Sequence, residues 1–411
     1  MVPPFGKTVL PNGLRVVTEH MPSAESVALG LFVTAGPEKE PTGCEGITHF
    51  IEHSLFKGTH RRSARQIAEE VDSVGGELNG FTERECTCIY ARVLAEHLPL
   101  AVDVLCDMLL NPSFRPDDLE REKQVVLDEI RQYEDTPHEL VHELVPQTMW
   151  EGHPLGRALL GSVGSIESLT PEEVRSYFAQ EYHPANIIAV AAGRVEHKCL
   201  ADMMAHAFSA DDPGGSDPVT DPPPVTGREK LVARRTEQVH FCLATPAFPE
   251  ADDARYPLAI VDEVLGAGAS SRLFQEIRES RGLAYGVGSY TMAFRRAGAF
   301  VITASVSPSN LAKVLELSRA ERERFRRDGP TDAELARAKE HIKGSAALAL
   351  ETTGARVRRL AGCEMYWGRP FPVEESLAKI EAVKRADVMA AAEQVFDPGR
   401  ENYVAIGPFG S

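Results

Sequence analysis

The chain has 411 residues, of which 43% are hydrophobic and 26% charged, and its formal net charge is −17 at pH 7. This length exceeds one ordinary core, so we expect two or more domains. The acidic charge argues against a nucleic-acid-binding protein, which usually carries a basic field. No apolar run reaches the roughly 18 residues of a membrane helix. The first residues lack the apolar segment of a secretory signal, so we expect a cytoplasmic protein.

In chain order, the patterns predict paired strands, a helix after a glycine turn, a further strand region, two helices, and a helix followed by a strand. This order occurs twice. In the first part the expected elements are 14–21, 26–36, 44–58, 75–93, 96–110, 117–134, 171–182 and 186–193. In the second part they are 230–236, 239–248, 266–282, 283–306, 310–325, 332–351, 385–396 and 401–407.

A stretch rich in Pro, Gly, Asp and Ser separates these two parts at 209–230, and we interpret it as a linker. We therefore expect an N-terminal domain at 1–208 and a C-terminal domain at 231–411. The repeated order predicts an α+β fold of two tandem homologous domains. Each should be a mostly antiparallel sheet with helices packed on one face.

The seven cysteines are odd in number and irregularly spaced, so they do not form a disulfide framework. Cys86 and Cys88 lie in the alternating pattern ECTCIYARV, which places both on one face of a strand. Two such thiols can bind a metal, but no second cysteine pair accompanies them. We interpret them as small strand residues.

The strongest chemical signal is His49-Phe50-Ile51-Glu52-His53. Ile47, Ile51 and Leu55 recur every four residues, as on a packed helix. His49 and His53 are also four residues apart, so their rings lie one turn apart on one face and can take two corners of a zinc tetrahedron. Glu52 borders that face and can reach a metal-bound water. This is the H-x-x-E-H arrangement.

A catalytic zinc usually has a third protein ligand. The helix expected at 117–134 carries Glu122 and Glu129 two turns apart, on the side that we expect also to bear Val125, Val126 and Ile130. Glu129 can serve as the ligand, with Glu122 orienting a ligand histidine. The spacing alone is equally consistent with Glu122 and Glu129 being charged residues on the protein surface.

The stretches GITHFIEHSLFKGT and VVLDEI resemble the pitrilysin and mitochondrial-processing-peptidase family, the inverzincins. The resemblance implies that His49, His53 and Glu129 bind one Zn²⁺ per chain. It also implies that Glu52 is the general base and that Glu122 supports the site. Both glutamates of the second helix stand at the family's spacing.

Two further motifs extend the resemblance over the whole chain. GGELNGFT resembles the family's G-G-x-x-N-A-x-T strand, which implies that Asn79, Gly80, Phe81 and Thr82 pair with a bound peptide; Gly80 replaces the usual Ala. SRLFQEIRESRGLAYGV resembles the R-x-x-x-x-x-x-Y element. There the family's Arg and Tyr bind the substrate backbone and help stabilise the oxyanion, a role that falls on Arg278 and Tyr285.

The resemblance is to the short, two-domain bacterial type and implies a zinc endopeptidase acting on peptides or unfolded segments. The zinc residues fall in the first domain and the Arg–Tyr pair in the second. Two chains are therefore expected to face each other as a clamshell, in a homodimer or in a heterodimer with a related subunit. No nucleic acid or membrane partner is expected.

Two alternatives belong to other classes. The family includes non-catalytic structural or assembly subunits, which lack an intact H-x-x-E-H, whereas here every ligand position is filled. A zinc-binding module without hydrolysis would leave Glu52 unexplained. The same His/His/Glu ligands also suit Co²⁺ or Mn²⁺.

Overall fold

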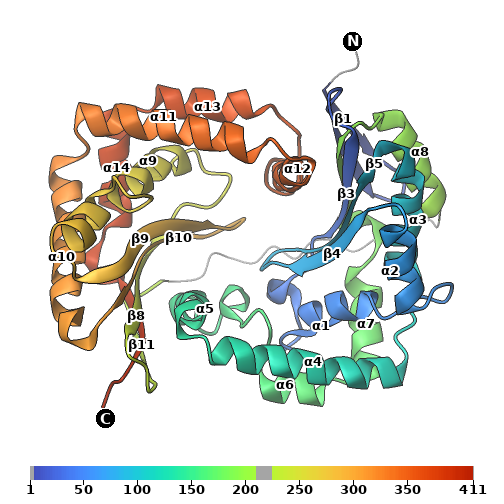
Figure 1. Ribbon diagram of the computed structural model, residues 1–411, viewed down its shortest axis with the longest axis horizontal. Coiled ribbons are helices and arrows are strands. Elements are labelled where there is room, and N and C mark those ends of the chain that lie inside the picture. Colours follow the sequence, from blue (N-terminus) through green and yellow to red (C-terminus); the bar gives the residue numbers. More distant parts are fainter. Residues whose placement is uncertain (1–3, 210–224, 411) are drawn as a thin grey trace. The chain divides into compact units, whose positions relative to one another are not determined.

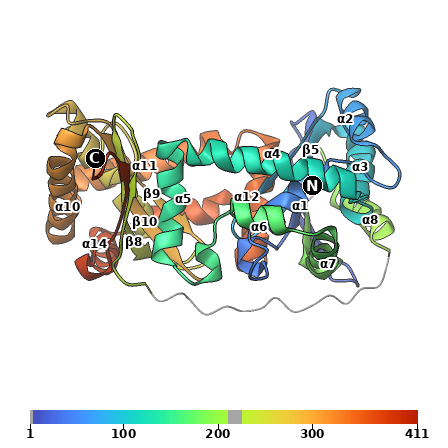
Figure 2. The same cartoon turned by 90° about the horizontal axis from the view of Figure 1, so that it is seen from below.

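The computed structural model describes residues 4–209 and 225–410 (Figures 1 and 2). The chain forms two compact units, and each contains segments from both parts of the sequence. Unit one comprises Met1–Arg131, Arg157–Val219 and Leu348–Phe371. Unit two comprises Gln132–Gly156, Thr220–Ala347 and Pro372–Ser411.

Unit one is built on a six-stranded sheet in the order β1-β2-β6-β3-β5-β4. Its pairs are antiparallel except for β2 and β6, which are parallel. The strands are β1 (Phe5–Val9), β2 (Arg15–His20), β3 (Ser26–Val33), β4 (Glu77–Thr82), β5 (Thr87–Leu94) and β6 (Ile187–Gly193). In the part of the chain that the structure describes, β4 pairs only with β5 and so forms one edge of the sheet.

Helices cover one face of this sheet, because every second strand residue there, such as Leu29 and Leu31, is apolar and fully buried. These helices are α1 (Ile47–Leu55), α2 (Ala64–Asp72), α3 (Leu98–Leu110), α4 (Pro116–Glu134), α6 (Val163–Ser168), α7 (Pro171–Glu181) and α8 (His197–Ala207). No helix among the described residues is both long enough and apolar enough to cross a lipid bilayer.

The opposite face of the unit-one sheet is covered by α12 (Thr353–Trp367), as Figure 1 shows beside β3. Phe32, on this face, packs in one buried cluster with Val357 and Leu360 of the helix. Gly30 allows the close approach: a Cβ there would lie 3.2 Å from Val357 Cγ1. Strand alternation thus places a separate apolar cluster on each side of the sheet.

Unit two repeats this plan with a five-stranded sheet in the order β7-β11-β8-β10-β9, the order of β2-β6-β3-β5-β4 in unit one. Only β7 and β11 are parallel. The strands are β7 (Glu229–Ala233), β8 (Val239–Ala247), β9 (Ala284–Ala293), β10 (Gly298–Val306) and β11 (Asn402–Gly407). The matching order confirms the internal repeat.

One face of the unit-two sheet packs against helices α9 (Arg255–Leu265), α10 (Leu311–Asp328), α11 (Asp332–Ala349), α13 (Val373–Ala382) and α14 (Arg385–Val395). A π-helix, η5 (Phe274–Glu279), precedes β9. Helix α5 (Pro137–Met149) covers the other face, where Val141 and Val145 join Ala244 and Ile406 in a buried cluster.

The expected fold of two tandem α+β domains is confirmed, with one addition. Each sheet is apolar on both faces, so each also needs a helix on its second face. Helix α5 lies within 1–208 in sequence but packs in unit two, and α12 lies within 231–411 but packs in unit one. Of the expected linker, 210–224 lies outside the described residues, and its last two residues begin β7.

We expect Leu360→Ala to lower the free energy of unfolding by roughly 2–5 kcal/mol, because Leu360 is fully buried between α12 and the sheet. Chemical denaturation measures this. Leu348→Ala is the matched control, since that side chain is 70% exposed, and it should change stability by about 0.5 kcal/mol or less. Equal effects of the two substitutions would contradict the packing of α12.

Candidate metal centre

Helix α1 is anchored at its start by the buried carboxylate of Glu40. Gly46 precedes the helix with φ 90° and, being glycine, has no side chain that could cap it. Glu40 instead accepts hydrogen bonds from the backbone N–H groups of Gly46 at 2.9 Å and Thr48 at 3.0 Å. Burial raises the pKa of Glu40 despite these bonds. Glu40 could not be predicted from the sequence, because a cap supplied from a preceding loop has no fixed spacing.

The two histidines of α1 meet Glu129 of α4. The Nε2 atoms of His49 and His53 lie 3.7 and 3.5 Å from Glu129 Oε2. One ligand atom from each of the three residues falls within 4.8 Å of the others, and no other such cluster of metal-binding side chains occurs among the described residues. The structure therefore brings together the three residues expected as ligands.

Two of the three ligand-atom separations fit zinc. A tetrahedral ion with bonds of about 2.1 Å separates its ligand atoms by roughly 3.4 Å. The histidine-to-Glu129 distances of 3.5 and 3.7 Å are close to that value. Two imidazoles and one carboxylate form the donor set of many catalytic zinc sites. Three protein ligands would leave a fourth position for water or substrate.

The two histidines have different electrostatic environments. Burial and the neighbouring His53 lower the pKa of His49 to about 3, so its ring is neutral and able to bind a metal. Burial also lowers the pKa of His53, but its hydrogen bond to Glu122 and the charges of Glu52 and Glu129 raise it more, and the net shift is upward. A cation at the site is therefore favoured by the surrounding carboxylates.

Glu122 orients His53. Its Oε1 lies 2.9 Å from His53 Nδ1, which leaves the Nε2 atom of that ring turned towards Glu129. Its Oε2 lies 2.7 Å from Lys57 Nζ. Burial raises the pKa of this carboxyl, but the hydrogen bonds to His53 and Lys57 lower it by more. The net shift of the pKa is downward, so Glu122 stays ionised. Lys57 was not among the expected site residues, although it stands four positions after His53.

Glu52 lies beside the triad, between α1 and β4. Its Oε2 accepts a hydrogen bond from Thr82 Oγ1 at 3.2 Å. Burial raises the pKa of Glu52, although His53 and Thr82 lower it in part. A Cβ at Gly80 would lie 2.7 Å from Glu52 Oε1, so glycine leaves room for the carboxylate here.

The four residues expected to bind peptide alternate across β4. Gly80 and Thr82 face Glu52. Phe81 faces the other side of the sheet, where it lies near Phe32, and Asn79 shares that side by alternation. The two faces of β4 therefore carry different side chains, and the strand backbone lies between them.

Arg278 and Tyr285 lie together in unit two, at the end of η5 and the start of β9. The Arg278 guanidinium carbon is 5.3 Å from the centre of the Tyr285 ring and 4.7 Å from that of Phe274. Tyr285 is 80% exposed, which is unusual for so large a side chain. The pair is thus available to a molecule outside unit two.

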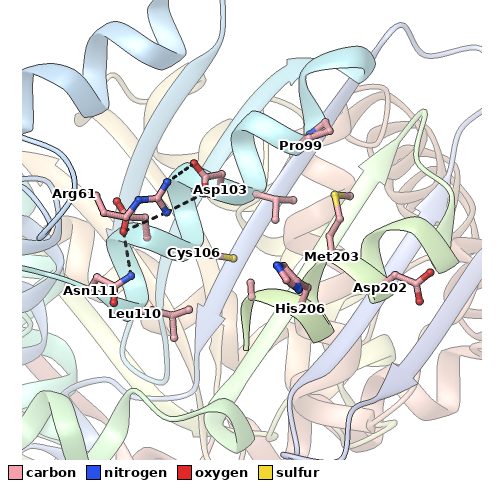
Figure 3. Close-up of a pocket in the computed structure, with 12 residues that line it drawn as sticks. Arg61, Pro99, Asp103, Cys106, Leu110, Asn111, Asp202, Met203 and His206 are labelled. Atoms are coloured by element: carbon pink, nitrogen blue, oxygen red, sulfur yellow. Dashed lines mark hydrogen bonds and ion pairs between the residues drawn. The ribbon is translucent and has the colours of Figure 1, made fainter. Parts of the chain in front are cut away.

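Two other groups of polar side chains, the Cys86–Cys88 pair and the lining of a cavity, form no metal site in the described part of the chain. Cys86 and Cys88 are buried against α12, and burial raises the pKa of both thiols, so they stay protonated. A cavity of about 560 Å³ lies between α3 and α8, with Asp103 and His206 in its lining (Figure 3). Arg61 pairs with Asp103 at 3.1 Å, so this acid is already neutralised.

We expect Glu122→Gln to weaken zinc binding roughly 10–100-fold, because His53 loses the charged acceptor that orients its ring. Titration against a chelator of known affinity measures this. The control is Glu120→Gln on the same helix, where the side chain is 69% exposed and should leave the affinity unchanged. Unchanged affinity in Glu122→Gln would mean that Glu122 supports only the fold.

Comparison with known proteins finds matches to peptidases along most of the chain. The pattern of insulinase (peptidase family M16) matches residues 15–163, and that of the peptidase M16 inactive domain matches 168–342. An uncharacterized zinc protease of Streptomyces coelicolor is 40% identical over 98% of this chain and 89% of its own length. The uncharacterized zinc protease YmxG of Bacillus subtilis is 36% identical over 94% of both chains.

Solved structures show the same fold. The crystal structure of a peptidase M16 inactive domain from Pseudomonas fluorescens superimposes with a TM-score of 0.92 at 20% identity, over 99% of this chain and 98% of that one. A protease from Helicobacter pylori gives a TM-score of 0.89 at 20% identity, over 99% and 100%. From the matched sequence patterns and full-length relatives, the chain belongs to the insulinase family of peptidases, peptidase family M16.

Proposed function

We propose that this chain is a zinc-dependent endopeptidase that hydrolyses peptides or extended polypeptide segments. The observation that carries the proposal is the convergence of His49, His53 and Glu129 within 4.8 Å, with the Glu52 carboxylate beside them. Zinc held by these three side chains would supply Lewis-acid polarisation of a water molecule and of the scissile carbonyl. The zinc protease relatives support this assignment of metal and reaction.

Glu52 is the proton carrier in this proposal. It takes a proton from the attacking water and delivers it to the leaving amine. Its raised pKa makes Glu52 a stronger base than an exposed carboxylate, which suits the removal of a proton from water. The Thr82 hydroxyl holds one carboxylate oxygen and so limits the rotation of the side chain.

The peptide is proposed to bind extended along β4. Among the described strands it is the edge of its sheet, so its outer backbone groups can pair with an added strand, which would replace the hydrogen bond that Gly80 N–H donates to Asn79 Oδ1. Backbone pairing tolerates varied side chains, as a peptidase acting on many sequences requires. It also excludes folded substrates, whose chains are already paired.

We further propose that two chains form the working enzyme. Arg278 and the exposed Tyr285 would bind the substrate backbone and stabilise the negative charge on the carbonyl oxygen. They belong to unit two, whereas the triad belongs to unit one. A homodimer in which each chain contributes a unit one and a unit two to a closed chamber would use both. Cytoplasmic location stays a prediction.

The second candidate is a non-catalytic structural or assembly subunit of the same fold. The name of the family's second domain pattern, an inactive domain, applies to 168–342 and not to the region with the triad. The intact ligand set and the placement of Glu52 favour catalysis over this alternative.

The substitution Glu52→Gln distinguishes the peptidase from the non-catalytic subunit. We expect it to keep full zinc occupancy, since Glu52 is not among the clustered ligands, and to reduce peptide cleavage at least roughly 10²–10⁴-fold, the usual share of general acid–base catalysis. Metal analysis and a fluorogenic peptide library measure the two effects. A wild-type chain that holds zinc and cleaves no peptide would refute the peptidase proposal and favour the structural subunit.

Mixing two inactive variants tests the dimer. Glu52→Gln inactivates the unit-one part of a site and Tyr285→Phe the unit-two part. If each site combines units from two chains, a mixed dimer has one site with both residues intact, and some activity should return. Glu52→Gln mixed with itself is the control. No recovery despite exchange of subunits, followed by light scattering or crosslinking, would exclude a site shared in this way.

A further inference from the structure

A second cavity of unit one lies on the α12 side of its sheet, opposite to Glu52. It measures about 310 Å³, at the lower end of the range for ligand pockets. Strands β3, β4 and β5 form its floor, and the first turns of α12 form its roof. Its lining residues are Ala28, Phe32, Phe81, Cys88, Tyr90, Gly354, Ala355, Val357 and Arg358.

The cavity is apolar inside and cationic at its mouth. Phe32 and Cys88 are almost fully buried, whereas Phe81 and Tyr90 are half-buried. The Phe81 ring centre lies 6.1 Å from the ring centres of both Phe32 and Tyr90. Arg358 is exposed, and its guanidinium carbon lies 4.6 Å from the centre of the Phe81 ring. Such a lining suits an aromatic or large aliphatic side chain and disfavours a basic one.

The cavity touches the strand on which substrate is proposed to bind. Phe81 belongs to β4, and its side chain forms part of the cavity wall. In a strand added to β4, the residue opposite Phe81 would point to the same side, with its Cβ about 4.5–5.5 Å from that of Phe81. The residues on either side of it would point towards Glu52. Strand alternation therefore delivers a substrate side chain to this cavity.

We propose that this cavity is a specificity subsite that receives a large apolar, preferably aromatic, substrate side chain pointing away from Glu52. Arg358, at the mouth, excludes lysine and arginine from it. The occupant is a residue of the substrate peptide, because Phe81 of β4 forms part of the cavity wall. The inference rests on the proposed peptidase function.

The test uses the intact zinc-loaded protein and a set of fluorogenic peptides with one cleavage site. Each position near the scissile bond is varied in turn among Phe, Leu, Ala and Lys. At one position we expect kcat/KM to be roughly 10-fold or more higher for Phe than for Ala, which is the usual gain from filling an apolar pocket. At the same position Lys should give the lowest kcat/KM. Positions next to it should not show this order.

Two variants assign the preference to the cavity. Ala355→Phe adds bulk to the lining and should abolish the preference for Phe over Ala. Arg358→Glu, at an exposed position, should make the Lys peptide a good substrate. Arg65→Glu is the charge-matched control on α2, where the side chain is 86% exposed, and it should leave all preferences unchanged.

The outcomes are separable. A wild-type enzyme that cleaves the peptides without such a preference, or whose preference survives both cavity variants, overturns the subsite and leaves the peptidase proposal intact. A zinc-loaded wild type that cleaves none of the peptides refutes the peptidase proposal, and the subsite falls with it. Zinc content and melting temperature show whether Ala355→Phe is folded, and Arg358→Glu gives an independent answer.

Discussion

The buried carboxylate of Glu122 ties two helices together at the candidate metal centre. It contacts His53 and Lys57 of the segment at the end of α1, while its own helix, α4, also carries Glu129. A buried carboxylate is costly unless it is fully paired, so this arrangement is stable only when α1 and α4 keep one relative position. The same constraint sets the distance between the histidines and the third ligand. Stability and site geometry therefore depend on one interaction.

Strand β4 joins two kinds of chemistry in one short segment. On one side Gly80 leaves space for Glu52, and Thr82 donates to it. On the other side Phe81 contributes to an apolar cavity. Because the period of a strand is two residues, a shift of one residue would exchange these faces and destroy both. The pairing of β4 with β5, which continues to the buried Thr82–Thr87 pair, holds that register.

The sequence predicted the α+β class and the internal repeat from the order and period of its elements, and the His49–His53 pair from its spacing. Glu129 as the third ligand came from the family resemblance, because its spacing alone suited a surface charge equally well. The sequence could not predict where α5 and α12 pack. An apolar stripe such as Val357 and Leu360 shows that a helix is buried, but not against which sheet. Nor could it predict Glu40 as the cap of α1, since that contact depends on a loop conformation. The roles given to Arg278 and Tyr285 come from resemblance.

The exchange of α5 and α12 has a consequence for the order of folding during synthesis. A ribosome releases the chain from its N-terminus, and domains usually fold as they emerge. The unit-one sheet, however, lacks the helix for its second face until Thr353–Trp367 has left the exit tunnel. Until then Phe32, Ile188 and Val190 remain uncovered on that face. Nascent unit one is thus a species with one exposed apolar surface, and its completion waits for nearly the whole chain.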